Sequence, residues 1–347
     1  MKKTLAVAAV LAAFAGSAFA DVTVYGKVDM GYLWKNVEGA DTLTLGNNGG
    51  NQSRIGFKGS EKIGDMTVGF VYETGLDPEN PSEKEFNNRQ SNIYVKGAFG
   101  ELGVGYYGVL DASTGSYSIT GSGAVSAAGT GWGGDILDQG WVIKTNGRMS
   151  NAVTYVSPAM AGLTAYAQVA SGTDATYGEY NDDVNMFYGV GAKYQAGNFG
   201  AVLTVTSTEV GKAGAGRSAT TVEDLNVVAG VNYNFGAFTA YLGANYYDTG
   251  VEGKDNYGVV ASAKAAVAGG TAYVSAGYGE VGDNKAGDET KMYFGVGDQY
   301  PLSKATFLYA GANWKQSDKS EVKNATTGKF GEEVNTTEVA FGMVHSF

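Results

Sequence analysis

Residues 338–347 read Glu338-Val339-Ala340-Phe341-Gly342-Met343-Val344-His345-Ser346-Phe347, and this stretch decides the expected fold. Its larger apolar side chains fall on alternate positions, and small residues fill most of the positions between them. Successive side chains of a β-strand point to opposite faces, so one face of this strand is apolar and the other is small or polar. Such a strand suits a barrel wall with lipid outside and water inside.

The first residues have the pattern of an export signal. Lys2 and Lys3 precede an apolar run over 5–14, and Ala18-Phe19-Ala20 has the small-x-small pattern of a cleavage site. The apolar run is too short to cross a bilayer as a helix. We therefore expect residues 1–20 to be a cleaved signal peptide and residues 21–347 to form one domain.

Composition narrows the class of protein. Beyond residue 21 there is no run of about 18 apolar residues, so a membrane protein made from this chain must span with strands. The chain has 54 glycines, 23 tyrosines and no cysteine, which excludes disulfides and thiolate zinc sites. Its net charge of -11 argues against nucleic acid as a partner.

Alternation of apolar and polar residues recurs along the chain, for example over 185–195, 225–235 and 240–246. Seven short breaks alternate with eight longer polar ones, which requires 16 strands with both ends on the short-turn side. Short breaks are expected at 64–65, 99–100, 159–162, 197–198, 236–237, 269–270 and 301–304, and long ones at 36–50, 75–88, 110–147, 173–182, 209–223, 249–256, 281–290 and 317–335.

The expected fold class is therefore all-β: a 16-stranded antiparallel transmembrane β-barrel in the outer membrane. The alternative is a soluble β-sandwich, whose strands also alternate. A sandwich domain has about 100 residues and seven to nine strands, so the number of strands and the two ends of the chain favour the barrel. Sixteen strands enclose a lumen wide enough for water.

Basic residues fall on the expected lumen side of several strands. Strand parity directs Lys27, Arg54, Lys58 and Arg148 inward. Arg89 shares the parity of outward-facing residues, so it faces the lumen only if a bulge or a subunit contact intervenes. The alternative for the arginines is a solvated charge at the barrel rim.

The connection over 110–147 is far longer than a hairpin needs. It carries apolar residues, including Trp132 and Trp141, with which it can pack. If it folds back into the lumen, it brings Asp111, Asp135 and Asp138 opposite the wall cations. Opposed charges across a constriction sort solutes by charge. The alternative is an exposed outer loop with solvated acids.

Enzymatic and cofactor sites find no support. The segment Gly103 to Gly108 matches a dinucleotide fingerprint, but no helix is expected after it. His345 is the only histidine, and it shares the outward parity of Phe341 and Met343, which leaves no plausible Ser-His pair and no histidine metal cluster. The acid pairs Asp182-Asp183 and Glu332-Glu333 are interpreted as solvated loop charge rather than a divalent-ion site. We expect no enzyme activity, no cofactor and no metal.

Several short motifs together resemble the general diffusion porins of Gram-negative bacteria, most of all the beta-proteobacterial type. The resemblance covers essentially all of residues 21–347. It rests on the residues 21–29, 53–61, 88–91, 151–158, 162–163 and 345–347, taken in their order and spacing.

This resemblance implies a homotrimer of 16-stranded barrels, with the third outer loop folded inward as an eyelet. The family's wall arginines match Arg54, Arg89 and Arg148, with Lys27 as a further basic position. Trp132-Gly133-Gly134-Asp135 resembles the loop motif, although the proline-acid pair that often precedes it is missing. Phe347 matches the terminal phenylalanine that the barrel assembly machinery recognises. Outer-membrane lipid and lipopolysaccharide are the implied surroundings.

The expected function is a water-filled channel for passive diffusion of ions and small hydrophilic solutes. Two alternatives stay open: a channel selective for sugars or carboxylates, with Tyr166, Phe187, Tyr241 and Tyr273 at inward positions, and a closed structural or adhesive barrel. The sequence does not decide between anion and cation preference.

Overall fold

The computed structural model describes residues 22–46, 52–76, 89–121, 123–127, 135–137, 139–172, 185–211, 221–284, 287–318, 327–329 and 331–347. These residues form one antiparallel sheet of 18 strand segments. The segments are β1 (Thr23–Val37), β2 (Ala40–Gly46), β3 (Arg54–Ile63), β4 (Met66–Gly75), β5 (Gln90–Gly97), β6 (Gly100–Gly108), β7 (Arg148–Val156), β8 (Leu163–Gly172), β9 (Asn185–Ala196), β10 (Phe199–Gly211), β11 (Thr221–Glu223), β12 (Leu225–Asn234), β13 (Phe238–Asp248), β14 (Asn256–Val267), β15 (Gly270–Asn284), β16 (Gly287–Pro301), β17 (Thr306–Ser317) and β18 (Val334–Ser346).

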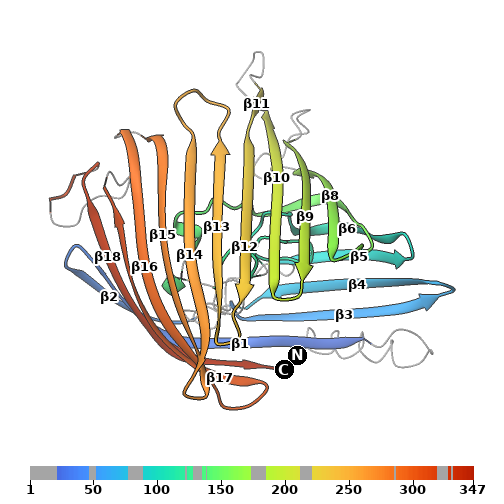
Figure 1. Cartoon of the computed structure of the whole chain (residues 1–347), viewed down its shortest axis with the longest axis horizontal. Coiled ribbons are helices and arrows are strands. Elements are labelled where there is room, and N and C mark those ends of the chain that lie inside the picture. The colour runs from blue at the N-terminus through green and yellow to red at the C-terminus, as the bar shows by residue number, and fades with distance from the viewer. Residues whose placement is uncertain are drawn as a thin grey trace, which may run out of the picture.

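The 18 segments make 16 barrel strands. β2 and β3 both pair with β1 and are two parts of one strand, and β11 and β12 both pair with β10 in the same way. β1 also pairs with β18 over Lys27–Val37, which closes the sheet. Figure 1 shows the first strand in blue beside the last in red. The predicted closed 16-stranded barrel is confirmed.

Connection lengths agree with most of the sequence predictions. All seven short breaks fall at junctions between consecutive strands, and the long connection between Gly108 and Arg148 has the predicted bounds to within one residue. The connections predicted at 75–88, 173–182 and 209–223 fall largely outside the described residues.

Two predicted long connections were wrong in their bounds. β1 and β2 join at Glu38 and Gly39, whose φ angles of 48° and 87° make a tight turn. The polar residues over 36–46 therefore belong to paired strand ends, where Asn36 donates to Asp41 at 2.7 Å. Likewise β15 extends to Asn284 and β16 starts at Gly287, inside the predicted loop at 281–290. The bounds were wrong because strands extend beyond the hydrocarbon layer, where their polar residues cannot be distinguished by sequence from loop residues.

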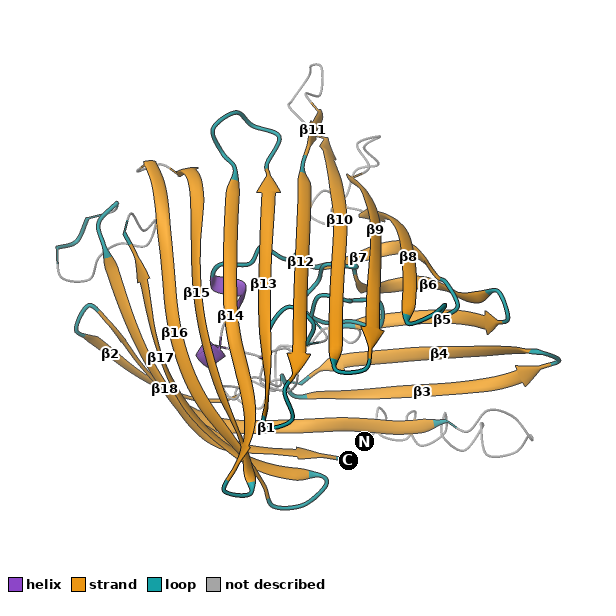
Figure 2. Cartoon of the chain, in the orientation of Figure 1, coloured by secondary structure: helices purple, strands orange, loops and turns teal. Residues whose placement is uncertain are grey.

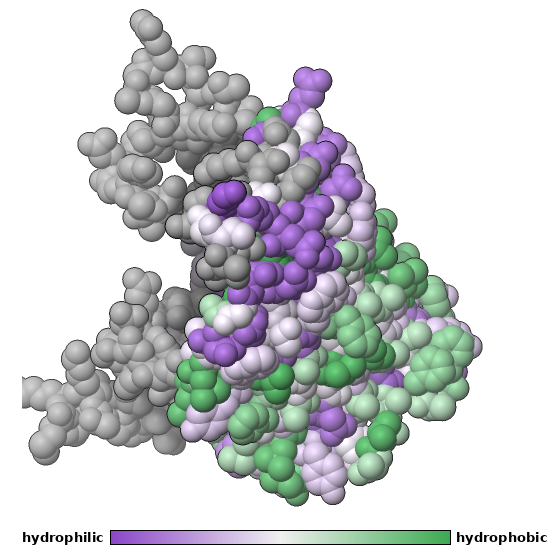
Figure 3. All heavy atoms as spheres, turned by 90° about the vertical axis from the view of Figure 1, so that its left-hand side faces the viewer, coloured by the Kyte–Doolittle hydropathy of each residue, from purple (hydrophilic) through white to green (hydrophobic). Residues whose placement is uncertain are grey.

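The outward face of the sheet is apolar. On β1 the outward residues Val24, Val28, Met30, Tyr32 and Trp34 are all exposed. Figure 3 shows hydrophilic residues gathered in the upper part of one face of the molecule and hydrophobic residues in its lower part. This division fits a band in contact with lipid below polar outer connections.

The inward face explains the abundance of glycine and tyrosine. Inward tyrosines lie directly opposite glycines on the neighbouring strand, as in Tyr25 with Gly56 and Tyr309 with Gly342. A Cβ on Gly342 would overlap the Tyr309 hydroxyl. Each tyrosine ring thus covers the gap that the glycine leaves, and the pair packs the wall.

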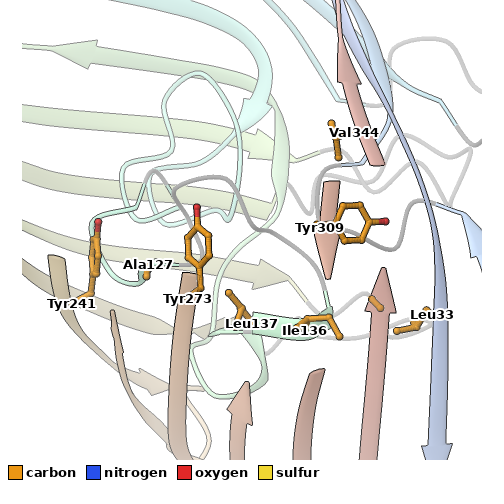
Figure 4. Packing of buried hydrophobic residues seen from close by; sticks show 9 residues of the cluster. Leu33, Ala127, Ile136, Leu137, Tyr241, Tyr273, Tyr309 and Val344 are labelled. Atoms are coloured by element: carbon orange, nitrogen blue, oxygen red, sulfur yellow. The ribbon is translucent and has the colours of Figure 1, made fainter. Parts of the chain in front are cut away.

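The described part of the long connection over 109–147 packs against the inward face. Its residues Val125 and Ile143 form a buried cluster with Val202, Val228 and Val260 of the wall. Figure 4 shows Ile136 and Leu137 between Tyr273 and Tyr309 in a second cluster. Burial of this apolar surface stabilises the connection inside the barrel by roughly 25 cal/mol per Å².

Wall glycines let the backbone of the connection approach closely. A Cβ on Gly258 would overlap the Val142 carbonyl, and one on Gly243 would overlap the Val125 side chain. The connection includes two short helical turns, η2 (Asp135–Leu137) and η3 (Gln139–Trp141), drawn in purple in Figure 2. In the described part of the chain, no helix is both long and apolar enough to cross a membrane.

Candidate functional site

Three arginines from separate strands meet at one cavity on the inward face. Arg54 begins β3, Arg89 immediately precedes β5 and Arg148 begins β7. The cavity has a volume of about 200 Å³. Its lining residues are Arg54, Glu73, Arg89, Gln90, Thr114, Gly115, Ser116 and Arg148.

Glu73 organises this cluster. Its Oε1 lies 2.5 Å from Arg89 Nε and 3.7 Å from Arg54 Nη1, and its Oε2 accepts a hydrogen bond from the Tyr25 hydroxyl at 3.0 Å. The sequence prediction missed this residue. The signal was present, because Glu73 is the only acid of β4 and pairs with the inward-facing position Gly56.

Arg89 is held inward in spite of its parity. It precedes the first residue of β5, so strand alternation does not fix its direction. Its side chain is buried, and Nη1 donates to Gln52 Oε1 at 2.5 Å in addition to the bond with Glu73. Arg89 is thus a paired, largely desolvated cation.

The lysines on the same wall share the inward face. Lys27 lies opposite Arg54 in the register of β1 and β3, and Lys58 lies opposite Thr23. The Lys58 ammonium sits 5.1 Å from the centre of the Tyr25 ring. Strand parity therefore places Lys27, Arg54 and Lys58 together on one side of the wall.

The long connection presents hydroxyl groups to the arginines. Arg148 Nη2 donates to Thr114 Oγ1 at 2.8 Å. Ser116 Oγ donates to Gln90 Oε1 at 2.8 Å, and the Ser116 backbone N–H donates to the same oxygen at 3.0 Å. The cavity is therefore lined by cations and neutral polar groups, and Glu73 is the one acid among its lining residues.

Asp111 is fully buried where the connection leaves the barrel wall. Its Oδ2 accepts hydrogen bonds from Asn146 Nδ2 at 2.8 Å, Thr206 Oγ1 at 2.8 Å and Asn226 Nδ2 at 2.7 Å. Burial raises the pKa of the Asp111 carboxyl, and these three hydrogen bonds oppose the rise only in part. Asp111 thus joins both ends of the connection to β10 and β12 from a buried position, whereas the sequence predicted it in the constriction opposite the wall cations.

The other two acids of the predicted constriction are not placed. Asp135 begins η2, but its side chain is outside the described part, and Asp138 lies outside the described residues altogether. Trp132-Gly133-Gly134 is also outside them. In the described residues, no loop acid opposes the arginine cluster.

A second charged cluster holds the part of the connection around Trp141. The Trp141 ring lies 5.1 Å from Lys291 Nζ and 5.5 Å from Lys315 Nζ. Lys315 also pairs with Glu338 at 3.0 Å, and Glu338 pairs with Lys35 at 3.2 Å. This cluster fixes the connection to β16 and β17 on the wall.

In the described part of the chain, no group of three or more histidine, aspartate or glutamate side chains is placed to hold a metal ion. At the end of the chain, Phe347 exchanges two backbone hydrogen bonds with Gly26, both 3.0 Å long. Phe347 therefore extends the pairing of the last strand with the first.

Comparison with known proteins gives consistent results. Residues 6–320 match a family model described as Gram-negative porin. Outer membrane porin protein 32 of Delftia acidovorans is 28% identical over 361 residues, covering 100% of both chains. Major outer membrane protein P.IB of Neisseria meningitidis serogroup B is 29% identical, covering 94% of this chain and 97% of its own. The structure of an anion-selective porin from Comamonas acidovorans has a TM-score of 0.72 at 22% identity, covering 94% of this chain and 100% of that one.

Proposed function

The chain belongs to the Gram-negative porin family, and on that premise we propose that its constriction favours anions over cations. The family membership and the closed barrel make it an outer-membrane channel through which small hydrophilic solutes diffuse passively. Family and fold point to a channel rather than an enzyme.

The charge of the arginine cavity carries this proposal. Lys27, Arg54, Arg89 and Arg148 contribute four positive charges to this wall, and Glu73 contributes one negative charge. A positive lining lowers the energy of an anion that has shed part of its hydration shell, and it raises the energy of a cation. The relative described as an anion-selective porin supports the same preference.

The neutral groups of the cavity suit brief rather than tight binding. The hydroxyl of Thr114 accepts a hydrogen bond from Arg148, so it can still donate its own hydrogen to a passing anion beside the Arg148 guanidinium. The negative charge of Glu73 offsets part of the positive charge of Arg89 and Arg54, which limits how long an anion stays bound. Conduction needs binding that is favourable enough for entry and weak enough for exit.

The described structure does not support the alternative of a sugar-selective channel lined by aromatic residues at the four predicted inward positions. Phe187, Tyr241 and Tyr273 are buried, the last two in the cluster that packs on the long connection. Tyr166 packs against another cluster beneath the connection. These rings therefore serve the packing of the wall and the connection.

The assembled state is also a proposal. Solved relatives include OmpT of Vibrio cholerae in a trimer form, with a TM-score of 0.66. The strands β5, β6 and β7 have only 8, 9 and 9 residues, compared with 15 in β15 and in β16. A spanning strand needs about 9–11 residues, so these three short strands only just cross the membrane. This part of the barrel wall therefore suits contact with neighbouring copies in a homotrimer.

Export and insertion complete the proposal. Residues 1–20, which precede the described part, act as a cleaved signal. The barrel assembly machinery reads the last strand with Phe347, and outer-membrane lipid and lipopolysaccharide surround the finished barrel.

Single-channel current across a planar bilayer with a salt gradient tests the main proposal. We expect ohmic steps and a reversal potential of the sign that shows anion preference. A cation-selective reversal potential would contradict the proposed role of the arginine wall, and absence of any steps would instead indicate a closed barrel.

A further inference from the structure

Asp298 on β16 faces the outside of the barrel. It shares the parity of Phe294, Val296 and Tyr300, which are exposed on the apolar face. Among the described residues, the Asp298 carboxylate has neither a hydrogen-bond nor a salt-bridge partner. A charge on the lipid face costs several kcal/mol at mid-bilayer and much less near the interface. Asp298 precedes the short turn at 302–305, which places it toward the periplasmic interface.

Asp298 also lines an apolar groove of about 550 Å³ on the outer surface. One wall of the groove is a row of outward residues that are paired in register from β16 to β2. The row consists of Asp298, Ala310, Phe341, Tyr32 and Leu45. The second wall is the parallel row of Tyr300, Leu308, Met343 and Met30, two positions nearer the periplasmic turns.

The dimensions of the groove fit one extended chain. Rows two residues apart on a strand are separated by roughly 6.6 Å, which is too narrow for a helix about 10 Å across. Four strand-to-strand steps from β16 to β2 span roughly 19 Å. The hydrocarbon of one leaflet is roughly 15 Å thick, so a tilted groove of this length matches a single acyl chain.

The charge lies at the correct end for a lipid headgroup. Barrel strands are tilted by roughly 45°, so a row paired in register climbs across the membrane as it passes from strand to strand. Asp298 is near a periplasmic turn, whereas Leu45 is on β2, the segment that follows the outer turn at Glu38 and Gly39. The carboxylate therefore marks the periplasmic end of the groove.

We propose that this groove binds a phospholipid of the periplasmic leaflet, with a primary-ammonium headgroup at Asp298 and one acyl chain along the notch at Ala310. An ammonium donates charge-assisted hydrogen bonds to a carboxylate, which a choline headgroup cannot do. The acyl chain covers the two apolar rows of the groove, and the headgroup supplies the partner that the Asp298 carboxylate lacks among the described residues.

Lipid retention measured by native mass spectrometry tests the site. The refolded protein is taken from vesicles containing equal amounts of phosphatidylethanolamine, phosphatidylcholine and phosphatidylglycerol with identical acyl chains. We expect the wild-type protein to retain phosphatidylethanolamine preferentially. Asp298→Asn should lower this preference about fivefold, in the range of an exposed ionic contact, and Asp298→Glu should keep it.

Ala310→Phe tests the acyl chain, because a phenylalanine side chain fills the notch from the outside. We expect it to lower retention of all three lipids. Asp65→Asn, which removes a carboxylate from a short turn outside the groove, is the matched control and should not change retention. Unchanged single-channel current in every variant confirms that each barrel has folded.

Three results would overturn the proposal. The first is equal retention of the three lipids by the wild-type protein. The second is retention that neither Asp298→Asn nor Ala310→Phe alters. The third is dissociation of subunits in Ala310→Phe with unchanged lipid retention, which would show that a second copy of the chain occupies the groove.

Discussion

Arg89 Nε donates to Glu73 Oε1 across 2.5 Å, and both side chains are buried. An ion pair removed from water in this way holds its partners firmly, because loss of one partner leaves an uncompensated charge. The arginine wall is thus not a set of three equivalent free cations. Arg54 and Arg148 are the more available groups, and Arg89 is fixed behind them by Glu73.

Glu73→Gln should strengthen anion preference and weaken the barrel. The variant removes one negative charge from the cavity and leaves Arg89 buried without its counter-ion, a change that costs about 3–5 kcal/mol. We expect the reversal potential to move further in the anion direction and the urea midpoint to fall. Tyr25→Phe is the control, because it removes only the hydrogen bond to Glu73 and leaves the charge unchanged. An unchanged reversal potential in Glu73→Gln would refute the role of Glu73.

Arg148→Gln should reduce the anion-to-cation permeability ratio, because it removes a cation from the cavity lining. Arg148→Lys retains the charge but not the planar donor geometry that reaches Thr114. We therefore expect the lysine variant to keep most of the ratio and the glutamine variant to lose about half or more of it. Equal ratios for both variants, measured by reversal potential, would show that charge at this position does not matter.

Asp111 should make stability depend on pH. Its pKa is raised in the folded state, so the folded protein binds this proton more tightly than the unfolded chain does. Stability from this group is therefore highest at acidic pH and falls as pH rises from the unfolded pKa of about 3.9 through the folded pKa. We expect Asp111→Asn to remove this component, which paired urea titrations of both proteins across pH 4–8 measure. Identical pH profiles would contradict it.

Removal of the Asp111 side chain should release the connection. Asp111→Ala leaves the donors of Thr206, Asn226 and Asn146 without their acceptor, at a cost of about 1–3 kcal/mol or more. We expect larger and noisier single-channel currents, since both ends of the connection lose their attachment. Asp111→Asn keeps an acceptor oxygen and should stay close to wild type in current noise. Current noise at the wild-type level in the alanine variant would show that the apolar contacts alone hold the connection in place.

Trp141→Leu should loosen the part of the same connection around residue 141. Each desolvated cation–π contact contributes up to about 2 kcal/mol, and this variant loses the contacts with Lys291 and Lys315. Trp141→Phe keeps an aromatic face and serves as the matched variant. We expect leucine to increase open-channel noise more than phenylalanine does, and the reverse order would contradict a cation–π attachment.

The barrel could be predicted from the sequence because alternation and turn spacing are local. The terminal strand, the seven short turns and the inward direction of Arg54 and Lys27 all followed from a period of two residues. Parity failed for Arg89 because that residue precedes its strand. It also could not show that Glu73 meets Arg89, since their contact depends on a side-chain reach across β4 and β5.

The sequence gives only a weak indication of the wall residues against which the long connection packs. Val227-Val228 and Val259-Val260 place apolar residues on both faces of β12 and β14, which breaks the alternation expected of a water-lined wall. The reason is that Val228 and Val260 contact the connection rather than water. The burial of Asp111 had no comparable signal, because its donors come from residues 35, 95 and 115 positions away.

The pairing of β1 with β18, continued by Gly26 and Phe347, has a consequence for biogenesis. The first strand can pair with the last only after the last has been made, so the contacts that close the sheet join residues that are far apart in the sequence. Loop-closure entropy makes such contacts late and slow to form. A truncated translation product therefore retains two unpaired edges prone to aggregation, and only the complete chain can reach the sealed cylinder.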